Sequence, residues 1–332
     1  MTVDLTVVTG DDRRWTGFST AARRFGLSVG RIDWGNAAGL SGPVRLDAVG
    51  EDPVVDARWC GRVRRRGEVA GSARWAAGFD QAAREVGGEP VPDPDDLAVL
   101  MDKRACHERL QAAGVPVPPA LTPVQGMDEL EASGWSRVFV KIRHGSSASG
   151  VLAITLGGGR ATAVGPVEVV DGKLFNSLRL HRFATRADVA YVVDLLAREG
   201  LHVERWIPKT QLRGRPVDLR VLCVAGRTTH VVGRAGRGPM TNLHLASHRV
   251  AVPDLRAGLG AGFDAAVEAA ERAAACFLGC LHVGVDVGVD GRGRPWVFEA
   301  NAFGDLLPGV PRLDGRLGST YDAQVEALVS AA

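Results

Sequence analysis

Apolar residues occupy every second position from Val283 to Val289, which predicts a β-strand. Turn-forming residues follow at 290–293, and a second apolar run begins at Pro295, so the whole segment is predicted to form a hairpin. A hairpin centred between Arg292 and Gly293 gives one continuous apolar face. Its predicted cross-strand pairs are Val285 with Ala300, Val287 with Phe298 and Val289 with Trp296.

The same register places two carboxylates, Asp286 and Glu299, opposite each other on the polar face. Asn301 shares the face of Glu299, because side chains alternate along a strand. Cross-strand neighbours have Cβ atoms about 5 Å apart, so both carboxylates can reach a pair of hard cations. Oxygen ligands favour magnesium held against phosphates over zinc. A surface hairpin with solvated acids is the alternative interpretation.

The rest of the pattern predicts alternating strands and helices. The first 50 residues predict a small α/β layer. The proline-rich, acidic segment 87–96 predicts a domain boundary. A helix is predicted over 97–114, with Asp96 as its cap and Lys103 on its surface.

A strand over 137–142 leads into a loop, 144–150, that contains two glycines and three serines. Lys141 alternates with apolar residues and is predicted on the less buried face of this strand, next to the loop. Such a loop can close over a polyphosphate, with the lysine supplying positive charge. An ordinary polar hairpin is the alternative.

Segment 201–226 predicts two strands joined by a basic loop, with Asp218 and Arg220 on one face of the second strand. Arg234 and Asn242 follow in a glycine-rich segment. These charges either face water or converge on one site with the charged residues of the other strands.

Composition limits the classes of protein. A chain of 332 residues with 45% hydrophobic content predicts a substantial core shared by two or three lobes. A net charge of +2 gives no basic surface for nucleic acid. The sequence shows no secretory leader and no apolar run of membrane-spanning length, so we expect a cytoplasmic protein without a membrane partner. The five cysteines are scattered without metal-ligand spacing.

Taken in order, the segments resemble the ATP-grasp superfamily over roughly 95–310. Two segments are similar to those of the D-alanine:D-alanine ligases: MDK at 101–103 and VKIRHGSS at 140–147. Three others are closer to the RimK-type ligases: DLRVLCVAG at 218–226, NLH at 242–244 and FEAN at 298–301. The resemblance implies an α/β fold of the ATP-grasp type. It places an N-terminal α/β domain at 1–95, a central lobe with the lid loop at 96–200 and a C-terminal lobe with a magnesium site at 201–332.

The resemblance also implies residue roles. ATP phosphates are expected to contact Lys103, Lys141 and the lid-loop residues His144, Gly145, Ser146 and Ser147. The adenine pocket is expected at Glu204, Arg205, Trp206 and Ile207, and the ribose at Asp218. Asp286, Glu299 and Asn301 are expected to bind two magnesium ions, or manganese, and Arg220, Arg234 and Asn242 to steady the transferred phosphate. The basic stretch 209–217 is longer than in relatives and separates Asp218 from the adenine segment.

The activity implied is ATP-dependent ligation. A carboxylate is activated as an acyl phosphate and joined to an amine, on a small molecule or a peptide. A homodimer is compatible with this resemblance. Three alternatives stay open: an ester-forming enzyme, a phosphoryl-transfer enzyme acting on a peptide, and a non-catalytic ATP-binding scaffold.

Overall fold

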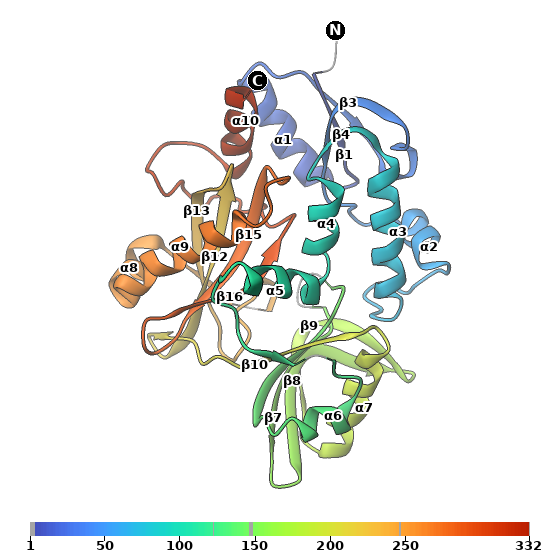
Figure 1. Cartoon of the computed structure of the whole chain (residues 1–332), viewed down its shortest axis with the longest axis vertical. Helices are drawn as coiled ribbons and strands as arrows, with labels where there is room; N and C mark the ends of the chain where they lie inside the picture. The colour runs from blue at the N-terminus through green and yellow to red at the C-terminus, as the bar shows by residue number, and fades with distance from the viewer. Residues whose placement is uncertain (1–3, 122, 146–148, 246, 332) are drawn as a thin grey trace.

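The computed structural model describes residues 4–121, 123–145, 149–245 and 247–331, and these residues form three β-sheets (Figure 1). The N-terminal sheet is parallel, in the order β2-β1-β3-β4. Its strands are β1 (Leu5–Val8), β2 (Val29–Ile32), β3 (Leu40–Leu46) and β4 (Gly87–Val91). Helix α1 (Asp12–Arg24) connects β1 to β2, and α2 (Pro53–Cys60) and α3 (Ser72–Glu85) connect β3 to β4, as parallel strands require. A single 3-10 turn (Trp34–Asn36) connects β2 to β3.

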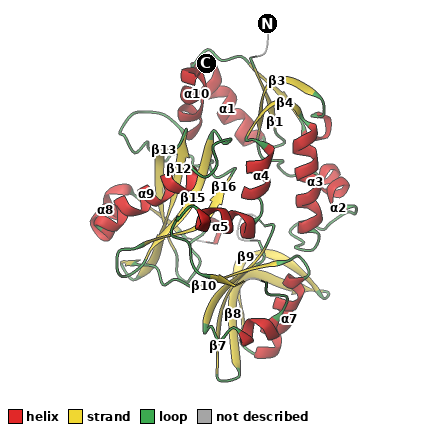
Figure 2. Cartoon of the chain, viewed as in Figure 1, coloured by secondary structure: helices red, strands yellow, loops and turns green. Residues whose placement is uncertain are grey.

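The central sheet is antiparallel, in the order β5-β10-β6-β7-β8-β9. Its strands are β5 (Ala120–Leu121), β6 (Arg137–Ile142), β7 (Val151–Gly157), β8 (Arg160–Val170), β9 (Lys173–Phe183) and β10 (Leu201–Arg205). Helices α6 (Met127–Ala132) and α7 (Arg186–Ala197) pack on one face and enclose a separate core (Figure 2). The other face is left to form one wall of the candidate site.

The C-terminal sheet has the order β14-β13-β12-β15-β16. Its strands are β11 (Gln211–Leu212), which pairs with β12 (Arg215–Val224), then β13 (Arg227–Ala235), β14 (His248–Val250), β15 (His282–Val289) and β16 (Pro295–Asn301). Helices α8 (Val252–Leu259) and α9 (Ala261–Ala274) pack against it, and α10 (Thr320–Ala331) returns to α1. Figure 1 shows α10 beside α1, near both chain ends.

The hairpin β15–β16 forms, with Val285 opposite Ala300 and Asp286 opposite Glu299 as predicted. A bulge beyond Asp286 then shifts the register by one residue. The predicted partners of two valines are therefore wrong: Val287 faces Val297 instead of Phe298, and Val289 faces Pro295 instead of Trp296. Because the side-chain period is two, this shift turns Val297 into the core and Phe298 toward the candidate site.

The predicted helix over 97–114 is instead two helices, α4 (Pro94–Leu100) and α5 (Lys103–Ala112). Asp93 caps α4 and Asp102 caps α5, each by accepting two backbone N–H groups, so the predicted cap Asp96 is wrong. The break makes Lys103 the first residue of α5, at the end that faces the central sheet. In the described ranges, we find no helix with the length and apolar character needed to span a membrane.

Candidate active site

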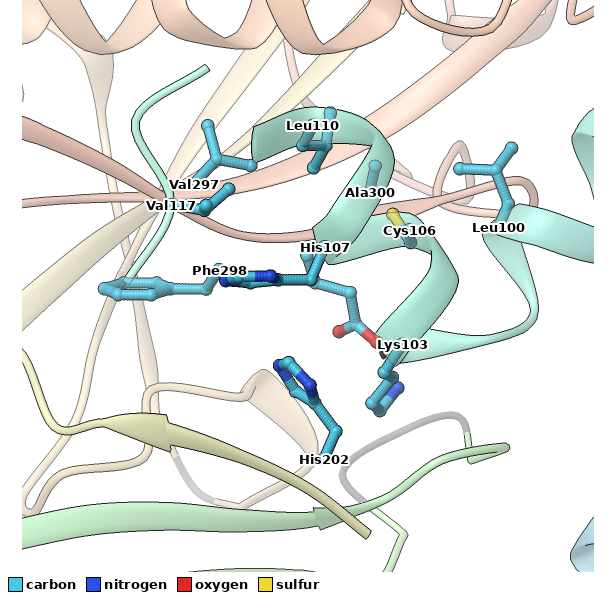
Figure 3. A pocket seen from close by; sticks show the side chains of 11 residues that line it. Leu100, Lys103, Cys106, His107, Leu110, Val117, His202, Val297, Phe298 and Ala300 are labelled. Carbon is cyan, nitrogen blue, oxygen red and sulfur yellow. Dashed lines mark hydrogen bonds and ion pairs between the residues drawn. The ribbon is translucent and has the colours of Figure 1, made fainter. Parts of the chain in front are cut away.

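The candidate site lies between the central and C-terminal sheets, next to α5. A cavity there is lined by residues of α5, β10 and β16 (Figure 3). Figure 3 shows Lys103 and His107 of α5, Phe298 of β16 and His202 of β10 gathered around it. Three segments that the sequence analysis treated separately therefore meet at one place.

Lys103 connects the helix, the lid loop and the predicted metal ligand. Its ammonium group donates to the carbonyl of Gly145 at 2.6 Å and forms an ion pair with Glu299, 196 positions away. His144 bonds the carbonyl of Met101 at 3.1 Å through Nδ1, and burial lowers its pKa. Ser146 and Ser147 of the same predicted loop lie outside the described residues.

Lys141 points from β6 into the same region. Its Nζ lies 2.5 Å from Glu204 Oε1 on β10 and 3.5 Å from the carbonyl of Phe298. Glu204 is 3% exposed, and its second oxygen lies 3.4 Å from His202 Nε2. Burial alone would raise the pKa of Glu204, but Lys141 and His202 lower it to about 2.

This pair predicts a pH-dependent contribution to stability. The folded pKa of Glu204, about 2, is below its ordinary value of 4.5, so the stabilisation is present above pH 4.5 and is lost as the pH falls toward 2. We expect Glu204→Gln to reduce the free energy of unfolding at pH 6. That difference from the unmodified protein should shrink by about 2 kcal/mol at pH 3. Urea unfolding at both pH values measures it, and a pH-independent difference would contradict the assignment.

Asp286 is held by two arginines of neighbouring strands. Arg220 on β12 approaches both carboxylate oxygens, at 2.5 and 3.1 Å. Arg234 on β13 lies 3.1 Å from Asp286 Oδ1 through Nη2. Both predicted phosphate-steadying arginines therefore stand beside a predicted metal ligand. Asn242, predicted with them, is half-buried in the segment after β13.

Asp218 is 3% exposed and surrounded by donors. It accepts from Arg234 Nε at 2.8 Å, from Lys209 Nζ at 3.1 Å and from the Thr241 hydroxyl. Burial alone would raise the pKa of Asp218, but Arg234 and Lys209 hold it below its ordinary value. A contact with ribose would have to replace one of these partners, so the predicted ribose role of Asp218 stays a prediction.

Lys209 lies at the candidate site and was not identified by the sequence analysis. Its ammonium group also donates to Thr241 at 2.8 Å and lies 5.5 Å from the centre of the Phe298 ring. The sequence placed it in a basic loop, whereas the structure buries it beside Asp218. His107 and His202 were also missed; their rings lie 5.1 Å apart in the cavity wall.

Of the predicted adenine segment, Glu204 is buried, Arg205 is exposed, and Trp206 and Ile207 are half-buried. The Arg205 guanidinium packs 4.8 Å from the Trp135 ring, and its backbone N–H donates to Pro119. Trp206 packs against Phe139 at 5.4 Å, on the face of the central sheet opposite α6 and α7. Ile207 follows, half-buried.

The donor types suit a hard cation, which would have to displace Arg220 from Asp286 and Lys103 from Glu299. Asp286 and Glu299 are opposite each other on β15 and β16, and Asn301 follows Glu299 on the same face, with Ala300 turned into the core. Asn301 donates through Nδ2 to the Gly284 carbonyl at 3.3 Å, which leaves its amide oxygen as the acceptor. The described part of the chain holds no group of three His, Cys, Asp or Glu side chains arranged for a metal. Two carboxylates and one amide suit magnesium shared with phosphates.

Comparisons with solved structures agree on the fold. D-cycloserine synthetase DcsG matches with a TM-score of 0.60 and 16% identity, covering 98% of this chain and 99% of its own. The ATP-grasp ligase PsnB, solved with a minimal precursor, matches with a TM-score of 0.58 and 14% identity, covering 100% of both chains. Another PsnB structure contains Mg and ADP. The macrocyclase MdnC from Microcystis aeruginosa, bound to precursor peptide MdnA, matches at 0.56 and 11%, covering 99% and 100%.

No protein-family model and no curated protein matches the chain by sequence. The structural matches nevertheless extend over nearly the whole chain, including the N-terminal sheet. The chain therefore has the ATP-grasp fold, as the ordered motifs predicted.

Proposed function

We propose that the protein is an ATP- and magnesium-dependent ligase that activates a carboxylate as an acyl phosphate and joins it to an amine. The observation that carries the proposal is the meeting of Lys103, Gly145 and Glu299. A helix N-terminus, the first residues of the predicted lid loop and the hairpin with the predicted metal ligands meet here through a partly buried ion pair. This convergence of two lysines and two carboxylates is what the binding of a nucleoside triphosphate with magnesium would need.

The side chains have the charges that phosphoryl transfer needs. Lys103 and Lys141 position the nucleotide phosphates, beside the Gly145 carbonyl that Lys103 contacts. Arg220 and Arg234 face the transferred phosphate, and Asp218 with Lys209 holds Arg234 in place. Magnesium bound by Asp286, Glu299 and Asn301 would offset the phosphate charge. Fixed charges in a closed site stabilise the transfer without a protein nucleophile.

The proposed substrate is a small-molecule or peptide carboxylate. Two structural neighbours, PsnB and MdnC, were solved with precursor peptides, which supports a peptide. An acyl phosphate is an electrophile that hydroxylamine captures as a hydroxamate, so the intermediate can be detected before the amine is known.

The test is ADP and phosphate release with magnesium and ATP, using pooled carboxylates and peptides with hydroxylamine as the trap. We expect hydroxamate from one pool, which would also identify the carboxylate. ADP without hydroxamate would point to phosphoryl transfer alone. ATP binding without turnover in every pool would favour the scaffold alternative.

A further inference from the structure

A short turn, residues 302–305, leads from Asn301 toward the N-terminal sheet. Arg14 of α1 donates to the carbonyl of Phe303 and to Asp305 Oδ1, the latter at 2.5 Å. From the opposite side, Arg220 Nη1 donates to the carbonyl of Gly304 at 3.4 Å. Two arginines from different parts of the chain therefore hold consecutive carbonyls of one turn.

The turn has little freedom to shift without moving Arg220. A Cβ added at Gly304 would lie 2.7 Å from Arg220 Nη1, 2.8 Å from Gly284 Cα and 3.3 Å from Asn301 Cβ. A side chain at position 304 would therefore force either the turn or Gly284 to move, and would push against the Arg220 guanidinium. The position of the turn is thus tied to Arg220, which holds Asp286, and to Asn301.

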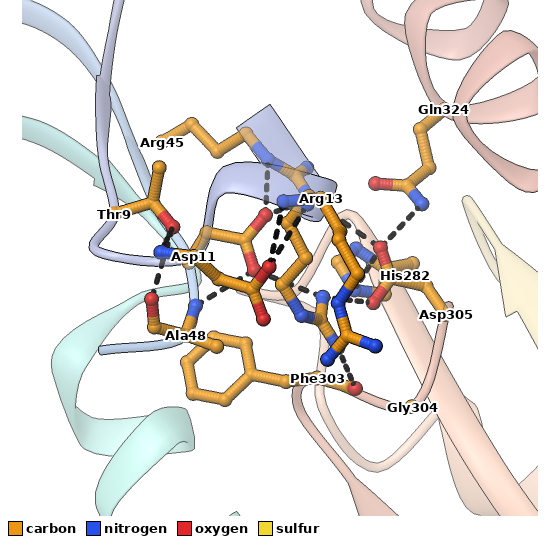
Figure 4. A network of polar contacts seen from close by, with 12 residues as sticks. Thr9, Asp11, Arg13, Arg45, Ala48, His282, Phe303, Gly304, Asp305 and Gln324 are labelled. Carbon is orange, nitrogen blue, oxygen red and sulfur yellow. Dashed lines mark hydrogen bonds and ion pairs between the residues drawn. The ribbon is translucent and has the colours of Figure 1, made fainter. Parts of the chain in front are cut away.

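A buried network fixes Arg14 itself. Its guanidinium bonds Asp47 Oδ1 at 2.9 Å, and Asp305 also accepts from Gln324 Nε2 at 2.9 Å. Arg14 is 6% exposed and Asp305 is fully buried. Figure 4 shows Arg45 and Thr9 facing Asp305, His282 and Gln324 across this network. Burial alone would lower the pKa of Arg14, but Asp305 and Asp47 hold it above its ordinary value.

The Phe303 ring adds an aromatic contact to the polar one. Its centre lies 5.9 Å from the Arg14 guanidinium and 6.3 Å from the Phe79 ring of α3, in an edge-on arrangement. Both partners belong to helices of the N-terminal sheet. The turn therefore docks on that part of the molecule through its backbone and through its side chain.

We propose that Arg14 is a positioning residue for the candidate active site. It holds the 302–305 turn in the place that keeps Arg220 and Asn301 aligned, so that the N-terminal sheet contributes to the site without touching the reacting atoms. This inference rests on the proposed function for its catalytic consequence. The positioning of the turn itself does not depend on it.

Arg45 offers a matched control within the same network. It is 3% exposed, bonds Asp47 Oδ2 at 3.0 Å and lies 3.5 Å from Asp305 Oδ2. Among the contacts of the described residues, none joins Arg45 to Phe303 or Gly304. Replacing either arginine by lysine keeps the charge but loses the planar fork that bonds two partners at once. A purely structural role predicts the same result for both.

The experiment compares Arg14→Lys with Arg45→Lys by hydrogen exchange of the amides at 302–306 and by magnesium-dependent ATP hydrolysis per folded molecule. We expect Arg14→Lys to speed exchange there about tenfold. It should lower kcat by about 10- to 100-fold while KM for ATP changes less than about twofold. Arg45→Lys loses only a 3.5 Å contact with the Asp305 side chain, so it should lower Tm to a similar extent but change exchange at 302–304 and kcat by less than about twofold.

Gly304→Ala should also lower kcat with the Arg14–Asp47 contact retained, because its methyl group meets Gly284 and Arg220 and so displaces the turn together with Arg220. Equal effects of the two lysine variants on exchange, or no effect of Arg14→Lys on the 302–306 amides, would overturn the proposal. If the unmodified protein shows no ATP turnover with any of the carboxylate or peptide pools, the proposed function fails. The exchange data would still decide whether Arg14 positions the turn.

Discussion

Glu299→Gln is expected to lower magnesium-dependent turnover on the order of 10³-fold while the protein stays folded. The substitution removes one negative charge from the proposed metal site and keeps the shape of the side chain. Lys103 retains the Gly145 carbonyl and can still bond the amide oxygen at position 299. The Glu299 side chain is 29% exposed, so the loss of its ion pair should cost at most about 1 kcal/mol of folding free energy.

Two measurements separate a metal ligand from a simple ion-pair partner of Lys103. A weakened metal ligand should raise the magnesium concentration needed for half-maximal turnover, and excess magnesium should recover part of the activity. Glu268→Gln, on the exposed face of α9, is the matched control and should leave both quantities unchanged. Unchanged turnover in Glu299→Gln would rule out the metal assignment.

The pairing of Asp286 with Glu299 could be predicted because it depends on local signals. The predicted register holds on the side of the bulge away from the turn, where Val285 pairs with Ala300 and Asp286 with Glu299, and it fails for the pairs next to the turn. The bulge beyond Asp286 could not be predicted in this way. The N–H of Val297 donates to the Pro116 carbonyl at 2.7 Å, and its side chain enters the core against α9. A distant segment therefore decides which of Val297 and Phe298 is buried.

Lys209 illustrates the same limit in the site. Its sequence neighbours are basic and polar, and nothing local distinguishes it from a solvated lysine. Its burial depends on Asp218 and on Thr241, 32 positions away. The ordered motifs predicted Lys103, Lys141 and Glu299 for one site, because each follows a local pattern that the family arrangement connects, and the structure places all three around the same region. The Arg14–Asp305 contact spans 291 positions and has no such pattern.

Lys141→Met should have the largest effect on nucleotide affinity. It should also lower the free energy of unfolding, because Lys141 is part of a buried ion pair. Lys141 is the partner of Glu204, whose side chain is 3% exposed. Removing the lysine leaves a buried carboxylate without its cation, which should cost about 3 kcal/mol of folding free energy. If Lys141 also contacts ATP phosphates, affinity should fall by about 30- to 100-fold through loss of a charge-assisted hydrogen bond. A single variant mixes the two effects.

The double variant Lys141→Met/Glu204→Gln separates them. With the buried charge gone from both positions, most of the lost folding free energy should return, because two neutral side chains need no ion pair. ATP affinity should stay low, since the phosphate contact is still missing. Urea unfolding and titration calorimetry with magnesium and a non-hydrolysable ATP analogue measure the two quantities, with Glu204→Gln alone as the control. Recovery of both in the double variant would mean that Lys141 supports the fold and not the nucleotide, and Lys103 would then be the remaining candidate for the phosphate contact.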